Sequence, residues 1–222
     1  MTSSKRAMID YIFVCDGEEL KALQKSLFSS DLKSKIFPIP IGINPVNNLL
    51  KNSQIPKDKS ILLIGLGGSL CPNYSVGDVV IYESCCYLDE GNLVTKNCDS
   101  QLNKYLRDKL NCSLVKGLTS NTLINQSSQK KSLFQKTSAS IVDMESFALL
   151  NYFQSVSVIR VVSDNYDDDL PDLNSAITFD GKLNNRKVAI AFLKEPWKAI
   201  KLIKNALISL QKLSAIVQML KN

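Results

Sequence analysis

Histidine is absent from the 222-residue chain, and this absence removes several classes of enzyme at once. Ser-His-Asp and Cys-His nucleophilic catalysis need an imidazole, as do zinc sites of the H-E-x-x-H and H-x-E kinds. Any acid or base chemistry of the protein therefore falls to Asp, Glu, Lys, Tyr or Cys side chains.

Long apolar runs and paired cysteines are missing as well. No stretch approaches the roughly 18 uncharged residues of a membrane span. The apolar run Ile9–Cys15 is short, contains Asp10 and is followed at once by acidic residues, so we expect no signal peptide and a cytoplasmic protein. None of the six cysteines forms a C-x-x-C pair, so we expect free thiols in a reducing compartment and no metal site.

The charge pattern also lacks the mark of a nucleic-acid-binding protein. The net charge is +6, but the lysines are scattered and no aromatic residues interleave with them, whereas nucleic-acid sites show a clustered basic stripe. Hydrophobic residues make up 45% and charged residues 22% of the chain, as in ordinary globular proteins. The charge pattern predicts no nucleic-acid partner. The composition predicts an ordinary globular protein, and we expect one domain over residues 1–222.

What is present is an alternation of short apolar runs with amphipathic segments, which predicts strands alternating with helices. Strands are expected at 9–15, 36–43, 60–64, 78–88, 113–118, 140–142 and 156–162, and helices at 18–28, 44–51, 102–110, 129–136 and 144–153. This order is typical of a three-layer α/β fold, in which helices flank a mixed, largely parallel central sheet.

Ligands in such folds bind where strands end in loops. That rule points to the segments at 65–68, 120–126, 143–145 and 163–167.

A long amphipathic helix is predicted at 195–220. Its apolar residues recur at three- or four-residue spacing: Trp197, Ile200, Ile203, Leu207, Leu210, Leu213 and Val217. Because lysines lie mostly elsewhere on this helix, the pattern is compatible with binding to a membrane surface. We expect the apolar stripe to pack on the sheet instead, as such stripes do in globular proteins, and we expect no membrane partner.

Three glycines, Gly65, Gly67 and Gly68, follow the apolar strand at 60–64. They do not form a dinucleotide-binding fingerprint, because position 70 is Leu and a turn signal follows where a helix should begin. Glycines allow a backbone to approach a ligand closely. A tight turn between two strands explains the same pattern.

Acidic residues stand at three junctions between strands and helices, namely Asp16–Glu19, Asp143–Glu145 and Ser163–Asp164. Each junction has a structural explanation, since acidic residues cap helix N-termini and are stabilised by the helix dipole. The functional alternative is a ribose site, because a carboxylate such as Glu145 accepts hydrogen bonds from two adjacent hydroxyls.

In combination these segments resemble the nucleoside phosphorylase and nucleosidase superfamily, most closely the 5'-methylthioadenosine/S-adenosylhomocysteine nucleosidases. The most specific matches are Val142–Glu145 to V-x-M-E and Arg160–Asp167 to R-x-I-S-D-x-A-D. Further matching segments are Cys15–Leu23, Gly42–Val46, Gly65–Gly68, Val76–Asp78 and Ser120–Asn125. The resemblance implies a purine nucleoside phosphorylase-like fold, no cofactor, and a purine nucleoside as the small-molecule ligand, as in methionine salvage.

The resemblance also implies a role for each matched position. Asp164 would help protonate the leaving purine at N7, Glu19 would activate a water, and Arg160 would orient that carboxylate and the water. Substrate contacts are implied for Glu145 and Met144 at the ribose, for Leu123, Ile124 and Phe179 at the base, for Ile43 near the 5' substituent, and for Gly65, Gly67, Gly68 and Ser163 elsewhere in the pocket.

The chemistry explains these residue types. Breaking an N-glycosidic bond builds positive charge on the ribose, and the purine leaves as an anion unless it gains a proton. A carboxylate near each group meets both demands without histidine, and acid or base assistance typically gives about 10²–10⁴-fold. An ordinary aspartic acid is charged at neutral pH, so Asp164 needs surroundings that keep it protonated or a proton shared with the bound base.

The chain departs from the family pattern in its middle, where the segment between Val79 and Gly117 is short and lacks the expected H-D-x-D sequence. In the nucleosidases that segment reaches into a partner's pocket and covers the 5' group. The 5' specificity and the usual homodimer therefore stay open. Leu66 and Tyr166 also replace small residues of the family pattern.

Three functions are compatible with the sequence. Hydrolysis of a nucleoside such as 5'-methylthioadenosine or S-adenosylhomocysteine is favoured, because a carboxylate at Glu19 serves water and repels phosphate. Phosphorolysis needs arginines around a phosphate, and of the four arginines only Arg160 lies in a matched motif. The third function is nucleoside binding without turnover.

Overall fold

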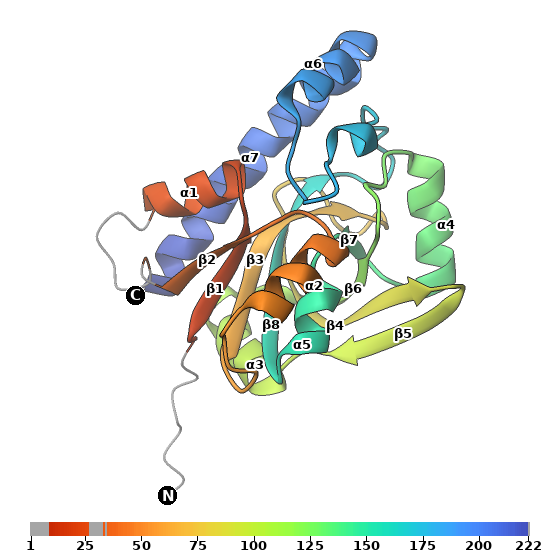
Figure 1. Ribbon diagram of the computed structural model, residues 1–222. Helices are drawn as coiled ribbons and strands as arrows, with labels where there is room; N and C mark the ends of the chain where they lie inside the picture. The colour runs from red at the N-terminus through yellow and green to blue at the C-terminus, as the bar shows by residue number, and fades with distance from the viewer. Residues whose placement is uncertain (1–8, 27–32, 34, 222) are drawn as a thin grey trace, which may run out of the picture.

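The computed structural model describes residues 9–26, 33 and 35–221, and Figure 1 shows its elements. The strands are β1 (Tyr11–Cys15), β2 (Ile36–Ile39), β3 (Ser60–Ser69), β4 (Val79–Asp89), β5 (Asn92–Asn97), β6 (Ser113–Thr119), β7 (Ile141–Asp143) and β8 (Ser155–Asp164). The helices are α1 (Glu18–Ser26), α2 (Ile43–Asn52), α3 (Ser100–Leu110), α4 (Ser127–Thr137), α5 (Ser146–Tyr152), α6 (Asn185–Lys194) and α7 (Pro196–Lys221), with a short 3-10 helix at Asn174–Ala176.

The strands form one mixed sheet that partly closes on itself. Parallel pairs join β1 to β2 and β3, β3 to β8, and β6 to β4 and β7. Antiparallel pairs join β3 to β7, β4 to β5 and β4 to β8. Because β3 pairs with β8 along most of its length and with β7 at its end, the strands β3, β8, β4, β6 and β7 form a ring. Parallel pairings predominate, which confirms the predicted sheet type.

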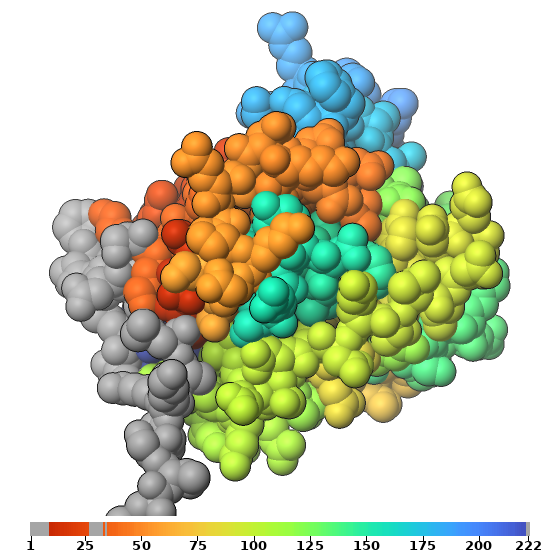
Figure 2. Space-filling view, turned by 60° about the horizontal axis from the view of Figure 1, so that its bottom comes forward, coloured from red at the N-terminus to blue at the C-terminus, as the bar shows by residue number. Residues whose placement is uncertain are grey.

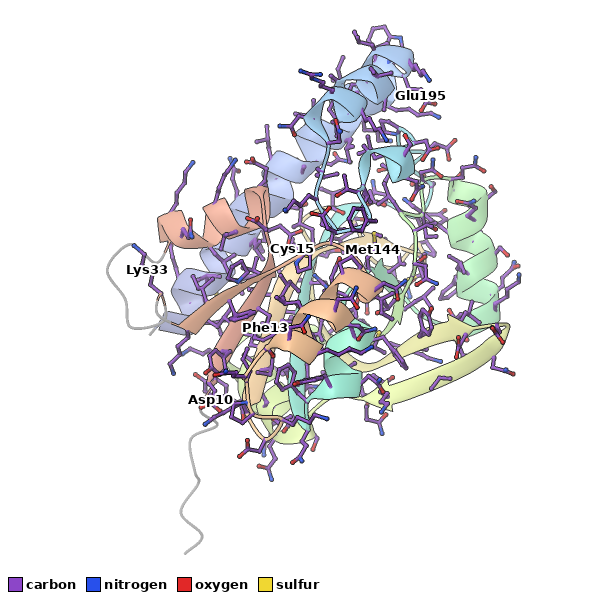
Figure 3. The ribbon with its side chains drawn as sticks, in the orientation of Figure 1. Asp10, Phe13, Cys15, Lys33, Met144 and Glu195 are labelled. Carbon is purple, nitrogen blue, oxygen red and sulfur yellow. The ribbon has the colours of Figure 1, made fainter. Side chains whose placement is uncertain are left out.

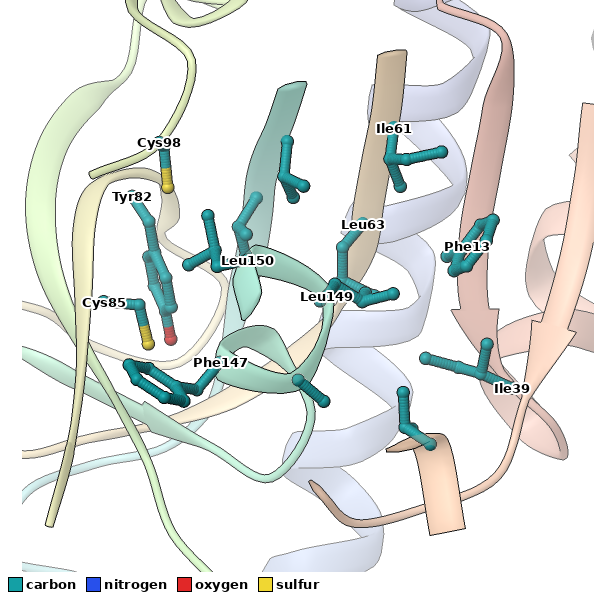
Figure 4. Close-up of a cluster of buried hydrophobic side chains, with 14 of the residues drawn as sticks. Phe13, Ile39, Ile61, Leu63, Tyr82, Cys85, Cys98, Phe147, Leu149 and Leu150 are labelled. Carbon is teal, nitrogen blue, oxygen red and sulfur yellow. The ribbon is translucent and has the colours of Figure 1, made fainter. Parts of the chain in front are cut away.

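Helices cover both faces of the sheet and so produce the predicted three layers. Alternate residues of β3 face opposite ways: Ile61 and Leu63 join a cluster with α2 and α5, whereas Leu62 and Ile64 join a second cluster with α1, α3 and α7. The first cluster is drawn in Figure 4, and Figure 2 shows α2 and α5 side by side on the outside of that face. A strand buried on both faces is apolar throughout, which explains the unbroken run at 60–64.

The predicted strand at 36–43 is too long. β2 ends at Ile39, and α2 begins at Ile43 with Gly42 before it at φ 99°. The helix therefore starts one residue before the predicted Asn44. β2 stands at the edge of the sheet, where Pro38 removes no ladder hydrogen bond that the fold needs. The last two residues of the helix predicted at 18–28 lie outside the described residues.

The tight turn considered for the glycine segment is also wrong, because β3 continues through it to Ser69. Gly65, Gly67 and Gly68 all pair with β8, with a register shift between Gly67 and Gly68. Their lack of a side chain makes room for neighbours. A Cβ at Gly67 would lie 2.8 Å from Cγ2 of Ile141, and one at Gly68 would lie 2.8 Å from Oδ2 of Asp164.

The predicted C-terminal helix is present as α7, but its apolar stripe packs on the sheet along only part of its length. Leu213 and Val217 are buried. In the first half the pattern is inverted: the large apolar side chains are exposed, while small or polar ones are buried. The exposed ones are Trp197, Ile200, Ile203 and Leu207, and the buried ones are Ala199, Asn205 and Ser209.

The geometry of the C-terminal hairpin explains this correction. Helix α6, which the sequence did not predict, and the start of α7 project together beyond the sheet (Figure 1), with Glu195 between them near the far end (Figure 3). The side chains that this part of α7 buries are small or polar. Within the described ranges, no helix is long and apolar enough to span a bilayer.

Candidate active site

A cavity of about 690 Å³ opens at the carboxyl ends of β1, β3, β7 and β8. Its size is that of a small-molecule site, and it lies where the sequence rule for α/β folds placed a ligand. Nine of the thirteen predicted site residues line it: Glu19, Gly67, Gly68, Leu123, Ile124, Met144, Glu145, Ser163 and Asp164.

The other four predicted residues lie elsewhere. Phe179 is 98% exposed and points into solvent, so in this structure it does not stack on a base in the cavity. Ile43, the first residue of α2, is buried in the core, and Ile41 lines the cavity in its place. Gly65 and Arg160 lie directly behind the cavity wall, where they support residues that do line it.

Arg160 is fully buried and holds two carboxylates. Its Nε donates to Oδ2 of Asp143 at 3.1 Å, and its Nη2 donates to Oε2 of Glu145 at 3.1 Å. Its Nη1 and Oε2 of Glu19 both lie over Gly65, so the role of Arg160 at Glu19 and a water stays a prediction. Asp143 and Glu145 both belong to the V-x-M-E segment, so Arg160 fixes that segment against β8.

Glu145 is held from two sides. Its Oε2 accepts from Arg160, and its Oε1 accepts from the backbone N–H of Gly42 at 3.1 Å. Burial raises the pKa of the Glu145 carboxyl, and the Arg160 guanidinium opposes that shift. Asp143 caps the start of α5 by accepting from the backbone N–H groups of Glu145 and Ser146, as the structural explanation of this junction anticipated.

Glu19 enters the cavity from the first turn of α1 with one oxygen unpaired. Its Oε2 is inaccessible to solvent and has no hydrogen-bond partner among the described residues. Burial raises the pKa of Glu19 to about 8, while Arg160 and a backbone hydrogen bond from Leu66 oppose the shift. A carboxyl that titrates near neutral pH and has a vacant lone pair is suited to act as a general base.

Asp164 is buried at the end of β8, and both of its oxygens have partners. Oδ2 lies 2.5 Å from Nζ of Lys130, and Oδ1 accepts from the hydroxyl of Ser163 at 2.7 Å. Lys130 is itself fully buried on α4. The purine-side carboxylate of the predicted site is thus one half of a buried ion pair.

Leu123 and Ile124 line the cavity, but the backbone of Leu123 is already engaged. Its N–H donates to Oδ1 of Asn174 at 2.8 Å, and its carbonyl accepts from Nδ2 of Asn174 at 3.0 Å. The contact of Leu123 and Ile124 with a base stays a prediction. Asn174 ties the loop at 120–126 to the segment that follows β8.

Cys15 and Met144 line the cavity from different elements (Figure 3). Burial and the nearby carboxylates of Glu145 and Glu19 raise the pKa of the Cys15 thiol well above its usual range. A neutral thiol is a poor nucleophile, so Cys15 contributes bulk to the wall. In the described part of the chain, no group of three or more His, Cys, Asp or Glu side chains is arranged to hold a metal ion.

Comparisons with known proteins agree on the architecture. No family model and no curated protein matches the sequence. The futalosine hydrolase of Helicobacter pylori strain 26695 has a TM-score of 0.68 at 15% identity, covering 96% of this chain and 98% of its own. The 5'-methylthioadenosine nucleosidase of Arabidopsis thaliana has a TM-score of 0.65 at 16% identity, covering 95% and 93%. The chain has the nucleosidase fold.

A Helicobacter pylori 5'-methylthioadenosine/S-adenosylhomocysteine nucleosidase gives the same result, with a TM-score of 0.63 at 16% identity over 95% of this chain and 98% of that one. At these identities the likeness establishes the nucleosidase fold. The sequence resemblance that predicted this fold is thereby confirmed, although it depended on a few short segments.

The sequence analysis did not identify two polar residues that contact the candidate site, Lys130 and Asn174. Lys130 stands next to Lys131 in a polar helix whose pattern predicts solvated lysines. Asn174 begins the short 3-10 helix between β8 and α6, in a segment with no periodicity to mark it. Only their burial and their partners distinguish them, and both depend on tertiary structure.

Proposed function

We propose that the protein hydrolyses the N-glycosidic bond of a purine nucleoside and releases the base. The observation that carries this proposal is the convergence of Glu19, Glu145 and Asp164 on one cavity, with Oε2 of Glu19 unpaired. These three carboxyl groups match the three tasks of the reaction: activating water, holding the ribose and assisting the leaving base.

Glu19 is the proposed general base. In its deprotonated form, the carboxylate accepts a proton from a water molecule, and the water oxygen attacks the anomeric carbon as the bond to the base breaks. The raised pKa of Glu19 strengthens the carboxylate as a base near neutral pH. Its negative charge also stabilises the positive charge that develops on the ribose.

Glu145 and Asp164 are proposed to act at the two halves of the nucleoside. Each oxygen of Glu145 keeps a lone pair beyond its present partner, so the carboxylate can accept hydrogen bonds from the ribose hydroxyls while Arg160 and Gly42 hold it. Asp164 is proposed to deliver a proton to N7 of the purine. Ser163 steadies Asp164 through the hydrogen bond to Oδ1.

The cavity favours water over phosphate as the nucleophile. Among the described residues that line it, none is an arginine, and the buried Arg160 already holds Asp143 and Glu145. Lys21 pairs with Glu18 on the rim. A phosphate dianion would lie beside Glu19 with no bidentate partner of the kind that such sites use.

The substrate is proposed to carry a 5' substituent, as 5'-methylthioadenosine and S-adenosylhomocysteine do. The support is the sequence resemblance together with fold neighbours named for nucleosides of this kind and for futalosine. The homodimer that the sequence resemblance suggests and the cytoplasmic location stay predictions.

The test is incubation of the purified protein with 5'-methylthioadenosine, S-adenosylhomocysteine, adenosine, inosine and futalosine, each with and without phosphate. Released base is followed by chromatography, with Asp164→Asn as the control variant. We expect release without phosphate that is at least 10²-fold slower in the variant. Release only with phosphate would make the protein a phosphorylase, and no release from any substrate would favour a binding role.

A further inference from the structure

Lys130 is a buried charge that the proposed chemistry does not yet use. It is fully buried, although lysine is almost never fully buried unless it is paired. Its Nζ lies 2.5 Å from Oδ2 of Asp164, 2.7 Å from the carbonyl oxygen of Asn165 and 3.1 Å from that of Asp168. All three N–H bonds of the ammonium group thus have an acceptor.

The position of this ammonium group raises the question of where Asp164 obtains the proton that it donates. Asp164 has to give a proton to the leaving purine, yet its Oδ2 forms a buried ion pair with Lys130. An ionised Asp164 by itself has no proton to donate. Within the described chain, the donors to its side chain are Nζ of Lys130 and the hydroxyl of Ser163, and of these the ammonium is by far the stronger acid.

We propose that Lys130 is a positioning residue that also supplies the proton which Asp164 passes to the leaving purine. This inference rests on the proposed hydrolysis and identifies the source of its acid. Lys130 holds the carboxyl through Oδ2, and Ser163 holds it through Oδ1. The two partners together fix the carboxyl plane at the end of β8, where Asp164 lines the cavity.

The protons balance as follows. As the bond between the anomeric carbon and the purine breaks, its electron pair goes to the base, and N7 becomes basic. One proton moves from Nζ of Lys130 to Asp164, and Asp164 gives one proton to N7. Lys130 is left as a neutral amine beside the Asp164 carboxylate, and the neutral base departs. The proton that Glu19 took from water leaves to solvent, and one proton returns from solvent through the emptied cavity to Lys130.

A purely structural role for Lys130 is the competing explanation, because its contacts to Asn165 and Asp168 also fasten the loop after β8 to α4. The two roles differ in their dependence on Asp164. A residue that acts through Asp164 has nothing to contribute once that carboxyl is replaced. A residue that only fastens the loop affects every variant alike.

The experiment is a double-mutant cycle on kcat and KM with the best substrate, using Lys130→Met, Asp164→Asn and the double variant. Methionine keeps the length of the lysine side chain without its charge. Lys131→Met is the matched control, because Lys131 is the adjacent lysine of α4 and is exposed. Urea unfolding of each variant verifies that it is folded.

We expect Lys130→Met to lower kcat by about 10²–10⁴-fold, with KM changed by less than about threefold, while Lys131→Met matches the wild type. In the Asp164→Asn background, Lys130→Met should change kcat by less than about threefold. An equal fall of kcat in both backgrounds would overturn the proposal in favour of loop fastening, and so would a normal kcat in Lys130→Met. A wild-type protein that releases no base would overturn the proposed function, and this inference with it.

Discussion

The side chain of Glu19 lies directly over Gly65, so that a Cβ at residue 65 would be 2.4 Å from Oε2 of the carboxylate. The same Cβ would be 2.4 Å from Nη1 of Arg160. The proposed general base and the buried guanidinium therefore converge over a single glycine of β3. Gly65 itself does not line the cavity, and its lack of a side chain lets the two charged groups approach each other.

Gly65→Ala is expected to disturb both charged groups. Overpacking of this kind typically costs about 1–3 kcal/mol of stability, and the displaced Glu19 should lower kcat. Urea unfolding and steady-state kinetics measure the two effects. If the clash with Glu19 matters, Gly65→Ala should cost less stability in a Glu19→Ala background, because one obstructing group is gone. Equal costs in the two backgrounds would contradict this interpretation.

The raised pKa of Glu19 predicts a loss of stability as the pH rises. The carboxyl has a pKa near 4.5 in the unfolded chain and about 8 in the folded protein. The folded state therefore binds the proton more tightly, and the stabilisation that this provides is complete below about pH 4.5 and disappears between that pH and about 8.

Comparison of the wild type with Glu19→Gln over pH 5–9 isolates this effect. The variant should gain relative stability as the pH rises, by up to about 1.4 kcal/mol for each pH unit crossed. Glu18→Gln is the matched control, because the side chain of Glu18 is 71% exposed in the same turn of α1. Parallel stability curves for the wild type and Glu19→Gln would show that the carboxyl titrates in its ordinary range.

The same titration should appear in the kinetics. A general base must be deprotonated, and the pH dependence of kcat/KM reports groups of the free enzyme. We expect kcat/KM for the best substrate to rise with pH and to level off above about 8, the pKa of Glu19. Glu19→Gln should remove this rising limb along with most of the activity. A limb that survives in Glu19→Gln would assign the titration to another group.

The sequence predicted the sheet type, the layers and most of the cavity lining because those features have local signals. The V-x-M-E and S-D segments, the apolar strands and the glycines of β3 are all visible as short patterns. What it missed depends on contacts across the chain. The partner of Asp164 is 34 positions away on a polar helix, and Arg160 turns toward Asp143 and Glu145 because β8 lies beside them only in the folded sheet.

Two further corrections have the same cause. Phe179 is an aromatic residue near a matched motif, which favoured base stacking, but it stands on a loop that exposes it. The apolar residues of α7 recur at the spacing of a buried helix face. That spacing does not show how far along the helix the sheet extends. In both cases the local pattern identifies a side chain that could be buried, while the surrounding structure decides whether it is.

The two halves of α7 should respond differently to the same substitution. Leu213 is fully buried against the sheet, whereas Leu207, earlier on the same helix, is 57% exposed. Leu213→Ala should cost about 2–5 kcal/mol through lost burial and a cavity. Leu207→Ala should stay within about 0.5 kcal/mol of the wild type. Urea unfolding measured at two protein concentrations distinguishes the explanations: a large, concentration-dependent cost for Leu207→Ala would mean that another copy of the chain covers the stripe in solution.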